Sequence, residues 1–496
     1  MRTPPRRLRR WKATVALAAT SSAALSGASA GAVLGAPAEA PGAPGAAATW
    51  TTGDKEGLGT STTVESKLWY TLTGGTMSEV YYPSGTTPNT RELQFAVTDG
   101  RTSTQLESDD TVTRAVSLVD PQSLTYRQTS TDQQGRWRLT KTYVTDPARP
   151  TVLLDVRFEA LTGDPYQLFA LYDPSLAGDA GNDSGSTSGS ALLSSDTHGS
   201  AGAVVSALMS SAPFSATTTG YVGTSDGRAE LVANHTLSTM YASAGPGNIA
   251  QVGQIPATGA STTFTLALGF GSDTTSALTT ANASLAQPFT AQLAAYQDGW
   301  HRYTKSLNRA PAKLDARLTA QYWASVMTLK AHEDKTYPGA FIASLTIPWG
   351  QAVNASGAGG AGNGYHFVWA RDEYEQVTGL LAGRQERRPE RGHLAVHPAA
   401  AARRPLPAEL RAGRYARPDQ HPAGRDGIPA HPGSAGGVGD QELLHRPHQE
   451  GRRLPRVTRS DDATGTVGGD RRILTVDHRG HDRRAHSRGL VGHQVR

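Results

Sequence analysis

The residues best suited to chemistry lie in one short stretch, GYHFVWARD at 364–372. Aromatic faces bind the C–H side of a pyranose ring, and planar charged groups bind adjacent hydroxyls in pairs. Tyr365 and Trp369 could supply the faces, while Arg371 could donate hydrogen bonds and Asp372 accept them. The same pattern is typical of a helix start, because a carboxylate is favoured near the positive end of the helix dipole. The spacing therefore leaves a sugar-binding pocket and a plain helix N-terminus both open.

A second polar group could bind a metal ion. One loop is rich in oxygen ligands: Asp173, Asp179, Asn182 and Asp183. Such ligands suit Ca²⁺, but the loop lacks the spacing of an EF-hand, so an ordinary polar turn is the preferred interpretation. The sequence thus calls for no cofactor and identifies no metal ligand, with Ca²⁺ left as an open alternative.

The first elements that must position these residues have β character. Short runs rich in β-formers are separated by turn residues such as Gly74 and Gly75: 68–72, 79–82, 93–97, 137–144, 151–158 and 262–270. Thr and Ser are abundant, and no helical period extends far in this part of the chain. We therefore predict an all-β sandwich over 48–285.

Helical periodicity begins at Pro288. One apolar stripe extends to the break at Pro311 and comprises Phe289, Leu293, Tyr296, Trp300 and Leu307. A second stripe comprises Leu314, Leu318, Tyr322, Val326 and Leu329. We interpret 286–312 as a helical linker and 313–383 as the opening of a helical domain, because near-helical spacing of apolar residues marks one buried face. Such a domain needs several further helices to close its core.

The composition changes abruptly after residue 383. Residues 384–496 contain 22 Arg but no Lys, Phe, Trp, Asn or Met, together with 10 of the chain's 15 His. The formal net charge of +5 arises from this stretch and the N-terminus, and positions 41–383 are acidic on balance. A nucleic-acid partner would require clustered Lys and Arg on a folded surface, so we expect none. The chain has no cysteine, which excludes disulfides and thiolate metal sites.

The N-terminus has the features of an export signal. Five Arg and one Lys within the first 12 residues precede an apolar run rich in Ala, Ser and Gly, with small-residue cleavage sites after Ala30 or near Ala40. We interpret 1–40 as a signal peptide and expect a secreted, extracellular monomer. A run of this composition would anchor weakly in a bilayer, so no stable membrane anchor is expected.

The motifs resemble those of bacterial glycoside hydrolase family 15. GYHFVWARD and the preceding GAFIASLTIPWG at 339–350 are similar to the first segments of the family's catalytic domain. SKLWYTLTGGTMSEVYYP at 66–83 and RELQFAVTDG at 91–100 resemble its N-terminal β-sandwich. The resemblance covers roughly 48–383 and implies a multidomain fold, an all-β super-sandwich followed by the beginning of an (α/α)6 barrel.

The resemblance also implies an activity. Family members of the glucoamylase and glucodextranase type release glucose from the non-reducing ends of α-glucan polysaccharides or oligosaccharides, with inversion. Tyr365, Trp369, Arg371 and Asp372 would hold the terminal glucose. The preference for α-1,4 or α-1,6 links is left open, because later helices carry the discriminating loops. Two other classes also stay open: a non-catalytic carbohydrate-binding sandwich, and a phosphate-dependent phosphorylase of the same architecture.

The catalytic pair of such an enzyme is missing from the sequence as it stands. An inverting glycosidase needs one carboxylic acid and one carboxylate base, and the family's acid lies in a glutamate-rich motif. Residues 465–469 contain no carboxylate. A one-base shift of permitted codons over 463–475 allows PRERWEEIGGYS, and the same shift over 402–410 allows PDGHFPQNS. We therefore predict a frameshift near 381–384, an out-of-frame or disordered tail over 384–496, no catalytic residue and an inactive chain.

Overall fold

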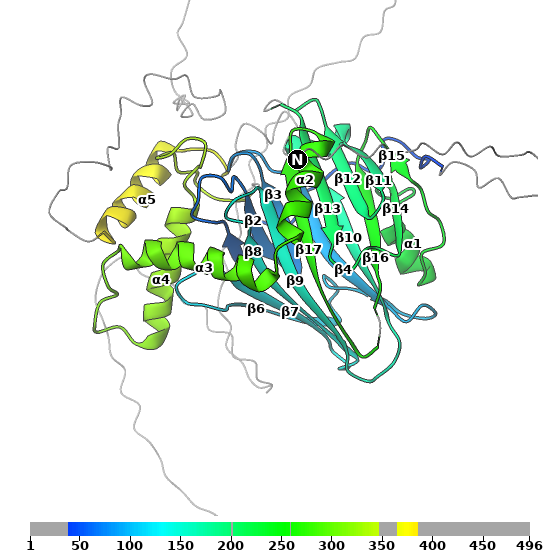
Figure 1. Ribbon diagram of the computed structural model, residues 1–496, viewed down its shortest axis with the longest axis horizontal. Helices are drawn as coiled ribbons and strands as arrows, with labels where there is room; N and C mark the ends of the chain where they lie inside the picture. The colour runs from blue at the N-terminus through cyan, green and yellow to red at the C-terminus, as the bar shows by residue number, and fades with distance from the viewer. Residues whose placement is uncertain (1–37, 200–201, 258, 347–364, 385–496) are drawn as a thin grey trace, which may run out of the picture. The chain divides into compact units, whose positions relative to one another are not determined.

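The computed structural model describes residues 38–199, 202–257, 259–346 and 365–384, which form two antiparallel β-sheets and five α-helices (Figure 1). The first sheet has eight strands: β1 (Gly57–Gly59), β2 (Trp69–Thr73), β3 (Thr76–Tyr81), β4 (Thr90–Thr98), β5 (Thr104–Leu106), β10 (Gln167–Pro174), β14 (Ala216–Tyr221) and β16 (Ile249–Ile255). Their order is β1-β2-β3-β4-β10-β16-β14, with β5 paired to β4. Long connections therefore bring strands that are distant in sequence side by side.

The second sheet has nine strands: β6 (Val112–Leu118), β7 (Tyr126–Asp132), β8 (Trp137–Thr145), β9 (Thr151–Ala160), β11 (Ser184–Ser188), β12 (Ala191–Asp196), β13 (Val204–Ser210), β15 (Ser243–Ala244) and β17 (Ser261–Gly271). Its order is β15-β11-β12-β13-β17-β9-β8-β7-β6. This pair of sheets confirms the predicted β-sandwich.

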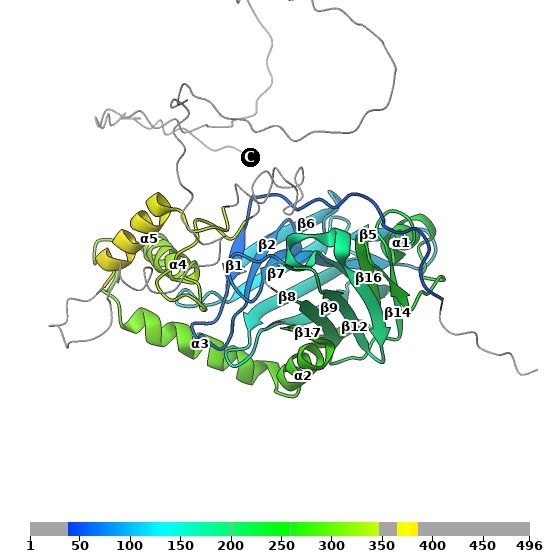
Figure 2. The same ribbon diagram turned by 90° about the horizontal axis from the view of Figure 1, so that it is seen from above.

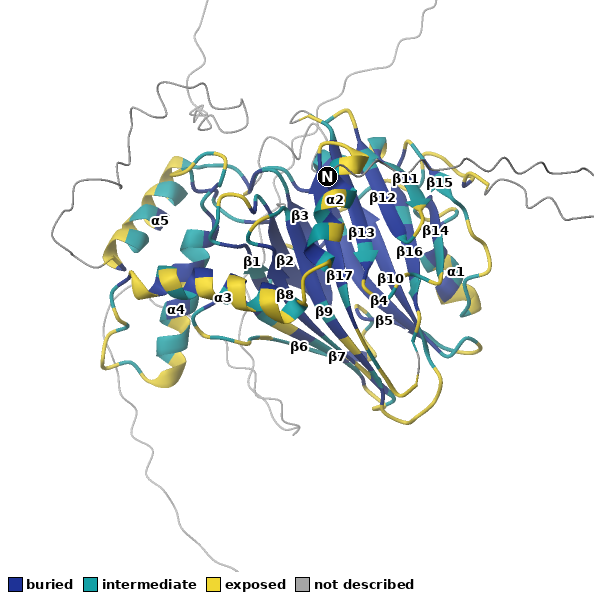
Figure 3. Ribbon diagram, viewed as in Figure 1, coloured by how far each residue is buried: buried dark blue, intermediate teal, exposed yellow. Residues whose placement is uncertain are grey.

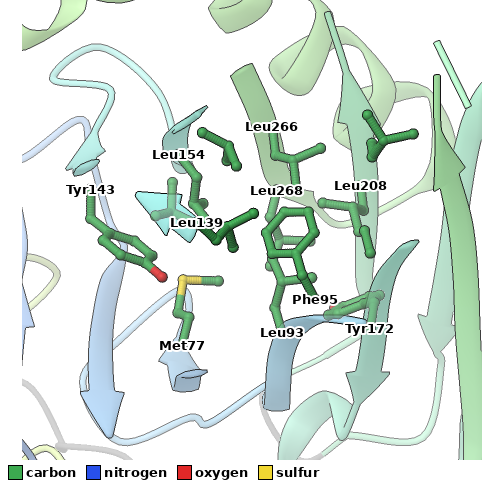
Figure 4. Packing of buried hydrophobic residues seen from close by; sticks show 14 of the residues in the cluster. Met77, Leu93, Phe95, Leu139, Tyr143, Leu154, Tyr172, Leu208, Leu266 and Leu268 are labelled. Atoms are coloured by element: carbon green, nitrogen blue, oxygen red, sulfur yellow. The ribbon is translucent and has the colours of Figure 1, made fainter. Parts of the chain in front are cut away.

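The main core lies between the two sheets, where alternate side chains of each strand meet (Figure 4). Leu93 and Phe95 of β4 pack against Leu154 of β9 and Leu268 of β17, as the period of two in a strand requires. Leu153 points to the opposite face of β9 and joins a second core beneath the helices. The first half of β9, residues 151–154, is therefore buried on both faces, which explains its continuous apolar run, whereas the second half alternates and Arg157 is exposed.

The core also contains a charged pair that sequence analysis did not anticipate. Lys141 and Glu107 are fully buried and form an ion pair at 2.7 Å. Lys141 Nζ also donates to the Gly75 carbonyl at 2.7 Å, and Ser130 Oγ donates to Glu107 at 2.7 Å. Burial lowers the pKa of the Lys141 ammonium, and Glu107 opposes this effect. These contacts stabilise both buried charges, because a charge that is buried without a partner is strongly unfavourable.

Two 3-10 turns, η1 (Leu176–Gly178) and η2 (Ala180–Asn182), and five helices complete the described structure: α1 (Gly227–Asn234), α2 (Thr274–Leu285), α3 (Phe289–Lys305), α4 (Ala316–Ala331) and α5 (Ala370–Ala382). Helix α2 covers β17, and α4 contacts α5 (Figure 2). No helix in the described ranges is long and apolar enough to cross a membrane. The predicted order of a sandwich followed by the opening of a helical domain is confirmed.

The helix preceding that domain packs firmly on the sandwich. In α3, Trp300 donates from Nε1 to the Thr60 carbonyl at 3.0 Å, and Tyr296 donates to the Leu124 carbonyl at 3.1 Å. Both aromatic side chains are buried, whereas the opposite face of α3 is exposed (Figure 3). The stripe predicted for this helix therefore corresponds to its contact face.

Candidate functional site

The segment singled out for chemistry begins as a turn at 365–367, which is hydrogen-bonded to residues 343–344. Ser344 N donates to the Tyr365 carbonyl at 2.7 Å, and Ala343 N donates to the Phe367 carbonyl at 2.9 Å. His366 is buried, whereas Tyr365 is 48% exposed. The backbone pairing therefore places one aromatic face of the candidate site in solvent.

The other three candidate residues lie where this segment becomes α5. Trp369 is the N-cap residue and is partly buried, and its carbonyl accepts the first helical bond from Glu373 N at 2.9 Å. Arg371 and Asp372 follow in the first turn and form an ion pair at 3.6 Å, with side chains 74% and 29% exposed. Asp372 thus lies in the first turn of a helix, as the interpretation of a helix N-terminus predicted. Its side chain also remains accessible to a ligand, as the interpretation of a sugar-binding pocket requires.

The segment packs on an apolar cluster to which the sandwich contributes. Val368 packs on a small apolar cluster made by Trp69 and Tyr81 of the sandwich with Ile342 and Leu345. Gln376 of α5 donates to the Ile342 carbonyl at 2.8 Å. The candidate site is therefore carried by elements that are far apart in sequence, from β3, which ends at Tyr81, to α5, which begins at Ala370.

Polar contacts strengthen the same junction. Trp69 Nε1 donates to the Ala331 carbonyl at the end of α4 at 2.9 Å, and Gly85 N donates to Asp334 Oδ2 at 2.9 Å. Lys335 is partly buried, and desolvation lowers the pKa of its ammonium, which lies 4.9 Å from the centre of the Trp69 ring. It also donates to the Ser66 carbonyl. The residue types and spacing in the sequence do not mark these residues as support for the site.

His366 is the least expected buried group of the segment. Burial lowers the pKa of its imidazole to about 4, although a hydrogen bond with the Thr346 backbone opposes this shift. Its Nδ1 has no hydrogen-bond partner among the described residues, so the bond to Thr346 uses Nε2. The imidazole is therefore neutral at pH 7 and serves as a donor.

The loop considered for Ca²⁺ forms the two turns η1 and η2. Asp179 caps η2 by accepting from Gly181 N at 3.0 Å, and Asp183 is fully buried and accepts from Leu176 N at 3.1 Å. Across the described part of the chain, no group of three His, Cys, Asp or Glu side chains could hold a metal ion. The structure thus gives the Ca²⁺ alternative no positive support, and it stays a hypothesis.

Asp173, at the end of β10, is expected to make stability depend on pH. Burial raises the pKa of this carboxyl to about 7 from 3.8, although Arg91 opposes the shift. The folded state therefore binds more protons than the unfolded state between these values, so stability falls as pH rises through this window. Asp173→Asn removes the carboxyl that titrates. The free energy of unfolding should therefore fall less between pH 4 and 8 in this variant than in the unmodified chain, by up to about 4 kcal/mol. Urea unfolding at several pH values measures the difference.

The control for this experiment is Asp164→Asn, which removes an exposed carboxylate from another loop of the sandwich. We expect it to follow the pH curve of the unmodified chain. If Asp173→Asn also followed that curve, the buried carboxyl would not titrate as the structure indicates.

The fold and this segment together define a class of protein: a large antiparallel sandwich joined to the opening of a helical domain, with an exposed aromatic and charged site at the junction. Comparison with known proteins agrees. Residues 40–305 match the family model described as glucodextranase, domain N, and residues 317–398 match glycosyl hydrolases family 15. The chain belongs to glycoside hydrolase family 15, in its glucoamylase and glucodextranase type.

Two individual relatives support this assignment. A glucoamylase from Clostridium sp. (strain G0005) is 34% identical over 345 residues, which are 68% of this chain and 47% of the relative. The crystal structure of a bacterial glucoamylase complexed with acarbose matches with a TM-score of 0.62 at 33% identity, covering 68% of this chain and 48% of that one. The chain thus spans about half the length of each, and the resemblance found in the sequence is confirmed.

Proposed function

We propose that this chain represents a secreted, exo-acting α-glucan hydrolase that releases glucose from non-reducing ends with inversion. The observation that carries the proposal is the arrangement of 365–372. An exposed Tyr365 precedes the accessible charges of Arg371 and Asp372 on a buried base. This combination supplies a face for a pyranose ring and paired groups for its hydroxyls. The acarbose bound to the related glucoamylase supports an oligosaccharide ligand.

Acarbose binding to the full chain tests the proposed sugar site. In isothermal titration calorimetry, Asp372→Asn should weaken binding by at least about tenfold, because hydrogen bonds to a charged group contribute about 1.5–3 kcal/mol. Glu375→Gln is the matched control, since it removes an exposed carboxylate from the same helix. We expect the control to bind as the unmodified chain does. Equal affinity of all three proteins would show that 365–372 is not the sugar site.

We propose further that a frameshift near 381–384 removed the catalytic carboxylates. The support is the pair of coherent strings that a one-base shift allows within 402–410 and 463–475. These stretches lie outside the described residues, as does nearly all of the predicted signal peptide 1–40. Sequencing the coding DNA across 381–384 tests the shift. A confirmed reading frame, together with glucose release from maltooligosaccharides above background, would contradict the proposal.

A carbohydrate-binding sandwich without catalysis is the less favoured alternative. Sugar-binding surfaces use exposed aromatic rings, yet the exposed aromatics of the described residues are Tyr365 and Tyr374, both outside the sandwich. A cavity of about 600 Å³ on the sandwich is lined by polar residues such as Gln105 and Arg136, with no aromatic side chain among them. No observation favours a phosphorylase. We therefore place sugar recognition at the junction with α5.

A further inference from the structure

The buried side of the sugar-binding segment contains one polar side chain that joins three parts of the chain. The His366 ring lies against Tyr81 of β3, with 6.3 Å between ring centres, and against the neighbouring Phe367 at 4.5 Å. It is hydrogen-bonded to the Thr346 backbone. Only 4% of His366 is exposed. One imidazole thus contacts the sandwich, the loop that includes Thr346 and the segment that precedes α5.

The location of this imidazole determines which way its neighbours point. His366 is buried and Val368 packs against the sandwich, whereas Tyr365, which directly precedes His366, is 48% exposed. Holding His366 in place therefore also fixes the backbone from which the Tyr365 ring projects into solvent. Val368 supplies only apolar contact. A rotation of the segment would move Tyr365 inward, and the hydrogen bond from His366 to Thr346 opposes that rotation. The orientation of the exposed ring therefore depends on a polar link as well as on packing.

We propose that His366 is a positioning residue, which fastens the sugar-binding segment to β3 and to Thr346 so that Tyr365 faces the ligand. The inference rests on the proposed function for the identity of the ligand. The new element is that the N-terminal sandwich, through Tyr81 of β3, helps to position the sugar-binding segment. The imidazole acts through Tyr365 and does not itself touch the sugar.

Two substitutions separate the polar link from simple packing. His366→Leu fills the space with an apolar side chain but cannot donate to Thr346. His366→Gln retains a donor near the location of Nε2, because its amide carries two N–H groups. His301→Leu is the matched control, since His301 of α3 pairs with Asp120 of the sandwich and lies outside the sugar segment. All three variants are made in the full chain.

Hydrogen exchange provides a measurement that does not depend on sugar. The amides of Ala343 and Ser344 donate to the segment, so a loosened segment should expose them. We expect His366→Leu to accelerate exchange at these two amides by about tenfold or more. His366→Gln should restore exchange to within about threefold of the unmodified chain, and His301→Leu should leave it unchanged. Acarbose dissociation constants should follow the same order, with about a tenfold loss for His366→Leu.

The outcomes distinguish this inference from the proposed function. If the unmodified chain fails to bind acarbose, the proposed function fails, while exchange at Ala343 and Ser344 still decides whether His366 positions the segment. Unchanged exchange in His366→Leu would overturn the inference. So would equal acceleration in His366→Leu and His301→Leu, because that result reports a general loss of stability.

Discussion

Glu107→Ala is expected to lower the free energy of unfolding by about 3–5 kcal/mol, because it leaves the Lys141 ammonium buried without its partner. Both side chains are fully buried between the sheets. The substitution also removes the acceptor for Phe95 N, which donates to Glu107 Oε2 at 2.9 Å. Urea unfolding of the full chain at pH 7, followed by tryptophan fluorescence, measures the loss.

Two further variants test this explanation. The double variant Glu107→Leu with Lys141→Met removes both charges and should be more stable than Glu107→Ala, because a buried pair replaced by apolar groups of similar size often costs little. Glu159→Ala breaks the pair between Arg157 and Glu159, in which the arginine side chain is 58% exposed. We expect this surface change to cost less than about 1 kcal/mol. If Glu107→Ala and Glu159→Ala lowered the free energy of unfolding by similar amounts, burial would not explain the effect of Glu107→Ala.

Trp69→Ala should destabilise the junction between the sandwich and the helical segment by about 3–5 kcal/mol, the usual cost of removing a buried tryptophan. The side chain is 1% exposed and packs on Ile342 and Leu345. It also donates to the Ala331 carbonyl and lies beneath Lys335. Hydrogen exchange should therefore accelerate most in residues 332–346, while the core strands β9 and β17 remain protected.

Trp69→Phe is the control that retains an aromatic ring. It loses the bond to the Ala331 carbonyl, so we expect a smaller cost that includes about 1 kcal/mol for that bond. The contrary outcome is that Trp69→Ala accelerates exchange equally in the sandwich core and in residues 332–346. That result would show that the side chain stabilises the sandwich in general, and it would contradict a specific role at the junction.

The amino-acid sequence predicts the strands well where the apolar pattern is strong. The run at 151–158 and the run at 262–270 correspond to β9 and β17, which form the centre of the second sheet. Helix α2 was missed, because its buried residues are small: Ala277, Ala281 and Ser284. The helix lies close to β17 there, since a Cβ at Gly269 of the strand would lie 3.0 Å from the Ala281 Cβ. Because α2 lies so close to β17, its buried face carries small residues and lacks the stripe of large apolar side chains that identifies a helix in a sequence.

Charged residues in the interior were the other features that the sequence did not reveal. Lys141 lies in a strand with alternating polar residues, and Lys335 lies in a polar loop, so both resembled solvent-facing positions. Lys141 is buried and Lys335 is partly buried because their partners come from distant segments: Glu107 for Lys141 and Ser66 for Lys335. Such pairs depend on tertiary structure, whereas a local motif such as 364–372 can be found from spacing and residue type.

The contact between Trp69 and Ala331 joins residues that are 262 positions apart, and this separation affects how the chain is made. A ribosome synthesises β2 and β3 long before α4, so the surface formed by Trp69 and Tyr81 lacks its cover while the rest of the sandwich emerges. Contacts of such long range form late and leave apolar surface transiently open to aggregation. During synthesis, the face of β2 and β3 that carries Trp69 and Tyr81 therefore stays exposed until residues 331–345 have emerged.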